Sequence, residues 1–192
     1  DADGNKFADE TKRAEAWKRY EKYWTQICDR FKDYSDHLIF EGANEELGDR
    51  LNDAIYESGY CVPKDDNDTK AISGNLTEDE RYEMANKINQ KFVDIVRSTG
   101  GNNAYRHLLI AGYDTNIDKT CDDRFKMPTD TTENGTTKLS ISVHYYTPWD
   151  FCGDGGSGIY TQKDKEATET YFTKMDKFYN AGYGIIMGEF SV

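Results

Sequence analysis

The chain has 192 residues, enough for one ordinary domain, and its 36% hydrophobic and 31% charged residues give it a globular composition. With 24 basic and 36 acidic residues its formal net charge is −12, which argues against binding to nucleic acids or anionic membranes. No apolar run approaches the roughly 20 residues of a membrane helix, and no signal peptide is visible. The 14% of aromatic residues and the many carboxylates suit a carbohydrate ligand, which stacks on rings and hydrogen-bonds to carboxylates.

The first predicted helix covers about residues 9–33. Its apolar stripe recurs at helical spacing and consists of Trp17, Tyr20, Trp24, Ile27 and Phe31. Cys28 lies on the same face, where we expect a buried free thiol. The other cysteines, Cys61, Cys121 and Cys152, lie in loop-like sequence without CxxC spacing, which argues against a metal or redox motif and leaves a disulfide among them open.

The rest of the chain alternates strands and helices. Thr77 and Glu80 form a capping box that begins a second helix, which Gly100-Gly101 ends. A third helix is expected over about 163–181, with Phe172, Met175 and Tyr179 facing inward and Gly182 as its stop. Apolar runs predict strands over residues 37–41, 108–113, 139–146 and 184–190.

Strands separated by helices are normally parallel, and the Leu/Ile-rich strands suit a sheet that is covered on both faces. Three of the four strands finish in residues capable of catalysis: the first in the Glu41–Glu45 segment, the third at His144–Tyr146 and the fourth at Glu189. This placement is typical of the active site of a (β/α) barrel. Two carboxylates from different strands can divide the roles of acid and nucleophile.

Four motifs carry a resemblance to glycoside hydrolase family 5. Residues 38–45 (LIFEGANE) resemble its acid/base strand, in which an Asn-Glu pair ends the fourth barrel strand. Residues 96–113 look like the next helix and the fifth strand. Residues 144–149 (HYYTPW) resemble the sixth-strand His-x-Tyr motif of subfamily-four endoglucanases, and residues 188–190 (GEF) resemble the seventh-strand nucleophile. Each motif alone is weak, but together they follow the order of the family across nearly the whole chain.

The resemblance implies a role for each motif residue. Glu45 is the expected general acid and later base, and Glu189 the expected nucleophile of a retaining double displacement. Four residues are the expected substrate-binding or orienting groups: Asn44 at the 2-hydroxyl, His144 beside the sugar, Tyr146 as a donor to the nucleophile, and Trp149 as a stacking surface.

The neighbours of the expected acid leave an alternative open. Glu41 has the same strand parity as Glu45, so alternation alone does not choose between them, and Glu46 occupies the position where the family usually has Pro. Ser191 also replaces a usual Gly. The second-strand Arg, third-strand His and eighth-strand Trp of the family have no counterpart in the chain.

The resemblance therefore implies an α/β fold, an incomplete (β/α)8 TIM barrel of four parallel strands and three main helices, with residues 1–192 forming a partial family 5 catalytic domain. The expected activity is that of a secreted, extracellular endo-β-1,4-glucanase (cellulase) that acts on cellulose or mixed-linkage β-glucan without a metal or organic cofactor. Xyloglucan, mannan or xylan is the alternative substrate. A further alternative is a non-catalytic or glycan-binding half barrel, whose partner is the missing part of its own barrel. We expect the isolated chain to have little activity because its sheet edges are open.

Overall fold

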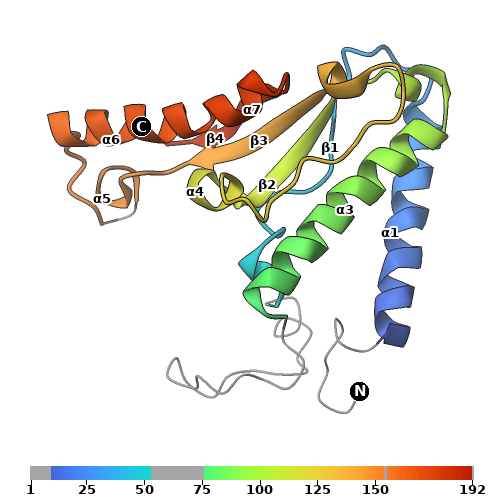
Figure 1. Ribbon diagram of the computed structural model, residues 1–192, viewed down its shortest axis with the longest axis horizontal. Coiled ribbons are helices and arrows are strands. Elements are labelled where there is room, and N and C mark those ends of the chain that lie inside the picture. The colour runs from blue at the N-terminus through green and yellow to red at the C-terminus, as the bar shows by residue number, and fades with distance from the viewer. Residues whose placement is uncertain (1–9, 53–75, 154, 192) are drawn as a thin grey trace.

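The computed structural model describes residues 10–52, 76–153 and 155–191, and its centre is a four-stranded sheet (Figure 1). The strands lie side by side in chain order: β1 (Phe40–Glu41), β2 (Leu108–Asn116), β3 (Leu139–Tyr145) and β4 (Gly184–Phe190). All three neighbouring pairs are parallel. The predicted half of a (β/α)8 barrel is confirmed, and the carboxyl ends of its strands meet at one edge.

The two central strands, β2 and β3, are buried along most of their length. In β3 the apolar residues Leu139, Ile141 and Val143 alternate with polar residues that are also buried, so this strand is covered on both faces although only one face is apolar. β1 is shorter than the predicted residues 37–41, because only Phe40 and Glu41 pair with β2.

The fully buried guanidinium of Arg106 explains the short β1. It donates hydrogen bonds to the carbonyls of Phe31, Tyr34, Ser35 and Leu38. The segment before β1 is therefore folded around this side chain and does not extend along β2.

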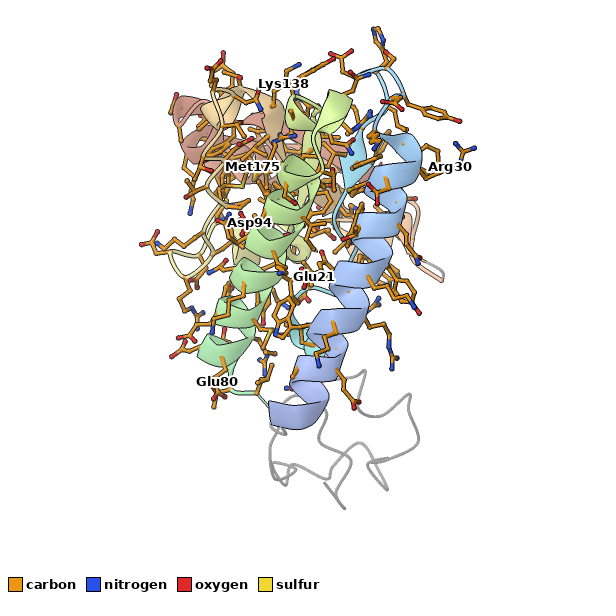
Figure 2. All side chains as sticks on the ribbon, turned by 90° about the vertical axis from the view of Figure 1, so that its right-hand side faces the viewer. Glu21, Arg30, Glu80, Asp94, Lys138 and Met175 are labelled. Carbon is orange, nitrogen blue, oxygen red and sulfur yellow. The ribbon has the colours of Figure 1, made fainter. Side chains whose placement is uncertain are left out.

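Two long helices, α1 (Glu10–Phe31) and α3 (Glu78–Ser98), pack side by side (Figure 2). The Trp24 ring lies 4.6 Å from the Phe92 ring across this contact. The Thr77–Glu80 capping box is present at the start of α3, and it satisfies backbone N–H groups that the first helical turn leaves free. Cys28 is a free, fully buried thiol, as the sequence predicts, and Asn103 donates a hydrogen bond to its carbonyl at 3.0 Å.

The expected helix over residues 163–181 is two helices, α6 (Gln162–Lys174) and α7 (Asp176–Asn180). The break at Met175 shifts the inward face, so that Met175 and Phe178 are buried. Phe172 and Tyr179 are 44% and 70% exposed, so their predicted inward placement was wrong. Ile27 on α1 is likewise 38% exposed and lies outside the buried part of its stripe.

Short elements complete the described chain. They are the 3-10 helices η1 (Asp49–Leu51), η2 (Gly101–Ala104) and η3 (Gly135–Lys138), and the short helices α4 (Ile117–Thr120) and α5 (Trp149–Cys152). Cys121 and Cys152 are free thiols, while Cys61 lies outside the described residues. Within the described ranges no helix has the length and apolar character needed to cross a membrane.

Candidate active site

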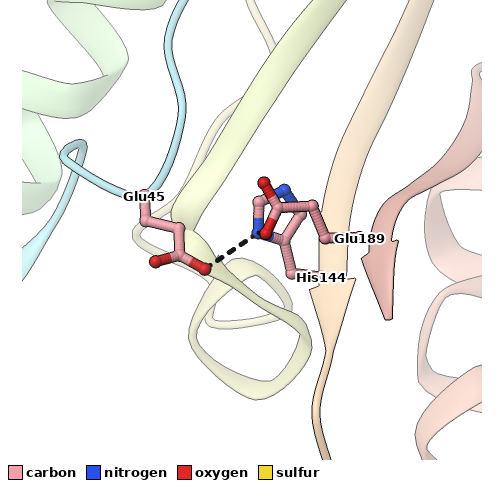
Figure 3. A group of neighbouring side chains, drawn as sticks. All are labelled: Glu45, His144 and Glu189. Carbon is pink, nitrogen blue, oxygen red and sulfur yellow. Dashed lines mark hydrogen bonds and ion pairs between the residues drawn. The ribbon is translucent and has the colours of Figure 1, made fainter. Parts of the chain in front are cut away.

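Glu45, His144 and Glu189 converge at the carboxyl edge of the sheet (Figure 3). The imidazole Nδ1 of His144 lies 3.0 Å from Oε1 of Glu45 and 3.4 Å from Oε2 of Glu189. One ligand atom of each of the three side chains lies within 4.8 Å of the ligand atoms of the other two. The structure thus brings the expected acid, the expected nucleophile and the expected sugar-side histidine into one cluster.

Parallel strand register creates this cluster. His144 on β3 pairs directly with Glu189 on β4, beyond a register shift at Val143/His144. A Cβ on Gly188 would lie 3.2 Å from Nε2 of His144, so a glycine there leaves room for the imidazole ring. Glu45 reaches the cluster from the loop that follows β1.

Tyr146 completes the contacts of Glu189. Its hydroxyl donates a hydrogen bond to Oε2 of Glu189 at 2.8 Å. That hydrogen bond raises the pKa of Tyr146, since deprotonation would place a phenolate beside a carboxylate. Tyr146 therefore remains a donor over the pH range in which proteins are normally active.

The structure separates Glu45 from the two carboxylates that flank it in sequence. Glu41 accepts a hydrogen bond from the Ser142 hydroxyl at 2.8 Å. Ser142 lies two residues before His144 on β3. Glu41 therefore lies one step deeper along the sheet than Glu45. Glu46 is exposed on the surface of the loop.

The two remaining expected binding residues are solvent-accessible at the same edge. Asn44 is exposed next to Glu45 in the chain. Trp149 at the start of α5 is 66% exposed, and a Cβ on Gly153 would lie 2.3 Å from its indole ring. The ring thus rests on the Gly153 backbone and leaves a large aromatic surface to solvent.

A pocket of about 470 Å³ opens beside the cluster. It is lined by the site residues Glu45, His144 and Tyr146 and by several residues that the sequence reasoning missed: Asp49, Arg50, Asp114, Thr115, Asn116, Lys119 and Thr147. Asp114 directly follows the predicted strand over 108–113, so the rule that found the other strand-end residues also applies to it.

Three of the missed residues form a charged group. Lys119 Nζ donates to Asp49 and to Asp114, each at 2.7 Å. Burial raises the pKa of Asp49, but hydrogen bonds from Lys119 and Tyr113 outweigh it and hold that pKa below its usual value. Burial raises the pKa of Asp114 in spite of Lys119. Burial also opposes the charge of Lys119, but its two carboxylate partners prevail and raise its pKa.

The Glu45–His144–Glu189 cluster offers two carboxylate oxygens and one imidazole nitrogen, a set that a divalent cation can also use. Two carboxylates at this separation can equally catalyse glycoside hydrolysis without a metal. In retaining enzymes the carboxyl groups are about 5–5.5 Å apart, and in inverting enzymes about 6.5–9.5 Å. Oxygens within 4.8 Å of one another fit the retaining class.

A protein-family model described as cellulase (glycosyl hydrolase family 5) matches residues 3–192. The chain belongs to glycosyl hydrolase family 5. It is 36% identical over 193 aligned positions to endoglucanase A of Paenibacillus barcinonensis, covering 90% of this chain and 42% of that protein. It is 32% identical to the xyloglucan-specific endo-beta-1,4-glucanase BoGH5A of Bacteroides ovatus, covering 90% of this chain and 32% of that one.

Solved family 5 structures share the fold. A lichenase from Caldicellulosiruptor sp. F32, in complex with cellotetraose, matches with a TM-score of 0.73 at 30% identity, covering 97% of this chain and 48% of that one. A xyloglucanase from Paenibacillus pabuli matches with a TM-score of 0.73 at 32% identity, covering 97% and 51%. The chain thus spans about half or less of these relatives, which agrees with four strands of a (β/α)8 barrel.

Proposed function

We propose that this chain carries the catalytic centre of a retaining endo-β-1,4-glucanase. The observation that supports this most strongly is the pairing of Glu45 and Glu189, whose oxygens lie within 4.8 Å of each other around His144 Nδ1. Tyr146 adds a hydrogen bond to one member of the pair only, Glu189. The two carboxylates therefore have different surroundings, as an acid and a nucleophile require.

In the first step, a carboxylate oxygen of Glu189 attacks the anomeric carbon and the glycosidic C–O bond breaks. Glu45 gives its proton to the departing oxygen. In the second step, Glu45 removes a proton from water, the water oxygen bonds to the anomeric carbon, and the Glu189 ester bond breaks. Glu189 must begin as a carboxylate, and the Tyr146 hydrogen bond stabilises that form.

Asn44 and His144 are the proposed contacts of the sugar at the point of cleavage, and Trp149 is the proposed surface on which a further pyranose ring stacks. The proposed substrate is cellulose or mixed-linkage β-glucan, as the names of the endoglucanase and lichenase relatives suggest. Xyloglucan is the second candidate, favoured by the two xyloglucan-active relatives. Because such polymers do not enter cells, we also propose that the protein acts outside the cell.

The proposed physical partner is the remaining part of a barrel. In the described sheet β1 and β4 are edge strands, and their backbone groups are free to pair with further strands. We accordingly propose that hydrolysis by the 192-residue chain alone is slow.

The test of function is a trapping experiment that does not depend on rapid turnover. A 2-deoxy-2-fluoro-β-cellobiosyl fluoride can glycosylate a nucleophile with loss of fluoride, while the fluorine at C2 slows hydrolysis of the ester. We expect mass spectrometry to find the fluorocellobiosyl group on Glu189. Glu189→Gln should abolish labelling, and Glu45→Gln should retain it, because fluoride leaves with little help from an acid.

Glu46→Gln is the matched control, since Glu46 neighbours Glu45 but is exposed and does not line the pocket. It should be labelled like the original chain. Absence of label on Glu189 under conditions in which the chain is folded would refute the proposal and favour a non-catalytic glycan-binding half barrel. Release of reducing ends from barley β-glucan, carboxymethylcellulose, xyloglucan, mannan and xylan then ranks the substrates. EDTA should leave the labelling of Glu189 unchanged. Loss of labelling in EDTA would favour a metal ion at the cluster.

A further inference from the structure

The pocket contains an unusual stretch of backbone at the end of β2. Asp114 and Thr115 have φ angles of 51° and 50°, in the left-handed region that residues other than glycine rarely adopt. They lie within the register shift between Ala111 and Asn116, where β2 bulges away from β3 before Asn116 pairs with His144. Such a conformation is unfavourable for these residues and persists only where the surroundings hold it.

The surroundings that hold Asp114 are the residues just after Glu45. The backbone N–H of Asp114 donates to the Leu47 carbonyl at 2.7 Å, and its Oδ1 accepts from the Asp49 N–H at 2.8 Å. A Cβ on Gly48 would lie 2.0 Å from that same Oδ1. The left-handed turn thus places Asp114 across the 47–49 backbone, in a space that only a glycine at position 48 leaves open.

This contact continues to the carboxylate of Glu45. Leu51 N–H donates to the Gly48 carbonyl, which closes the η1 turn, and Arg50 within that turn lies 3.5 Å from Oε2 of Glu45. The other oxygen of Glu45 faces His144 Nδ1 at 3.0 Å. Glu45 is thereby held between a residue of the clamped turn and a residue of β3.

We infer that Asp114 is a positioning residue for the acid/base Glu45, acting through the 47–50 turn. Lys119 Nζ donates hydrogen bonds to both Asp114 and Asp49 at 2.7 Å each, and its positive charge offsets the repulsion between these two carboxylates. The inference rests on the proposed role of Glu45, but the clamp itself can be measured whether or not the chain is active.

The structural arm of the test uses the imidazole nitrogens as reporters. The chain has three histidines, so ¹⁵N-histidine labelling gives few signals. His37 and His107 bond to Ser35 and Ser140 and serve as internal references. We expect Asp114→Ala to move the His144 Nδ1 resonance in the same direction as Glu45→Gln does. We also expect hydrogen exchange at the Asp49 amide to be about five- to tenfold faster.

Two variants act as matched controls. Asp114→Asn keeps an oxygen that can accept from Asp49 N–H, so it should restore the His144 signal. Asp118→Ala removes another carboxylate that pairs with a lysine, Lys174, and should change neither readout. If Asp114→Ala does not fold, Gly48→Ala displaces the same contact from the other side and should move the His144 signal in the same way.

Faster exchange at Asp49 with an unchanged His144 signal would overturn the inference, because the clamp would then not reach Glu45. Unchanged exchange would also overturn it. A chain that is not labelled at Glu189 would refute the proposed function and leave this result intact. In a labelled chain, Asp114→Ala should lower kcat/KM for β-glucan about tenfold and hardly affect kcat/KM for 2,4-dinitrophenyl cellobioside, because this constant reports the first step and that leaving group needs no acid.

Discussion

The hydroxyl of Tyr146 donates a hydrogen bond to Oε2 of Glu189 at 2.8 Å, and so links the loop after β3 to the end of β4. Removing the donor leaves Glu189 with one fewer partner for its charged form, which is the nucleophilic form. We expect Tyr146→Phe to slow labelling of Glu189 by the fluorosugar roughly tenfold or more. Tyr160→Phe is the control, because its hydroxyl bonds to Thr168 instead. Equal labelling rates in both variants would contradict the role of Tyr146.

Trp149 tests whether an exposed ring binds glycan. Its indole is 66% exposed above Gly153, so removing the side chain sacrifices little core packing. We expect Trp149→Ala to weaken binding of cellotetraose about three- to tenfold in calorimetric titrations, with the melting temperature nearly unchanged. Tyr179→Ala, at a 70% exposed aromatic residue on α7, should not alter binding. A comparable loss in the Tyr179 variant would show that binding is not localised at Trp149.

The buried carboxylate of Asp130 should make the free energy of unfolding depend on pH in the acidic range. Burial raises its pKa, but hydrogen bonds from Thr132 and from Arg97, at 2.8 Å, outweigh burial and hold the pKa below its usual value. A carboxyl whose folded-state pKa is lowered stabilises the fold above its unfolded pKa, about 3.9, and loses this contribution as the pH falls through the folded-state value.

We therefore expect Asp130→Asn to reduce the free energy of unfolding in urea by about 2–3 kcal/mol at pH 7 and by less at pH 3. Asp79→Asn breaks an ion pair with Arg124 at a side chain that is 79% exposed, and it should have little effect at either pH. A deficit in the Asp130 variant that is equal at pH 7 and pH 3 would show that its charge is not responsible.

We expect the segment leading to β1 and Glu45 to depend on Arg106 for its stability. Its buried guanidinium donates to four backbone carbonyls and to Asn103 Oδ1. Arg106→Met would remove one donor from each of these five acceptors and leave a buried cavity where the guanidinium lay, and we expect a loss of about 3 kcal/mol or more in urea unfolding. Arg106→Lys should recover only part of it, since an ammonium cannot reproduce the planar fork. Arg124→Met, at a surface arginine, should cost far less.

The family resemblance selected Glu45, while the strand pattern alone predicted the parallel sheet and placed His144, Tyr146, Glu189 and the Glu41–Glu45 segment at one edge, because each of these follows an apolar run and strand ends converge. The strand pattern did not separate Glu41 from Glu45, since both have the same parity. The structure separates them because Glu41 contacts Ser142, whereas Glu45 contacts His144, which lies two residues closer to the carboxyl end of β3.

Other features depended on contacts between distant segments. Asp114 became important through a left-handed turn that meets residues 47–49, and no local pattern signals such a contact. The helix break at Met175 shifted the buried position from Tyr179 to Phe178, which periodicity alone does not indicate. Likewise, Arg106 looks like an ordinary surface cation in sequence, whereas it is fully buried.

The rate at which a thiol reagent modifies the buried Cys28 can report local unfolding of α1. Burial raises its pKa to about 11, and no part of the residue is exposed, so a thiol reagent reacts only after α1 has moved away. Cys121 and Cys152 are only partly buried and should react first. The rate of the slow labelling phase of Cys28 then reports how often α1 detaches from the core. A lower rate in the presence of a glycan would show that ligand binding at the active site also stabilises the packing of α1.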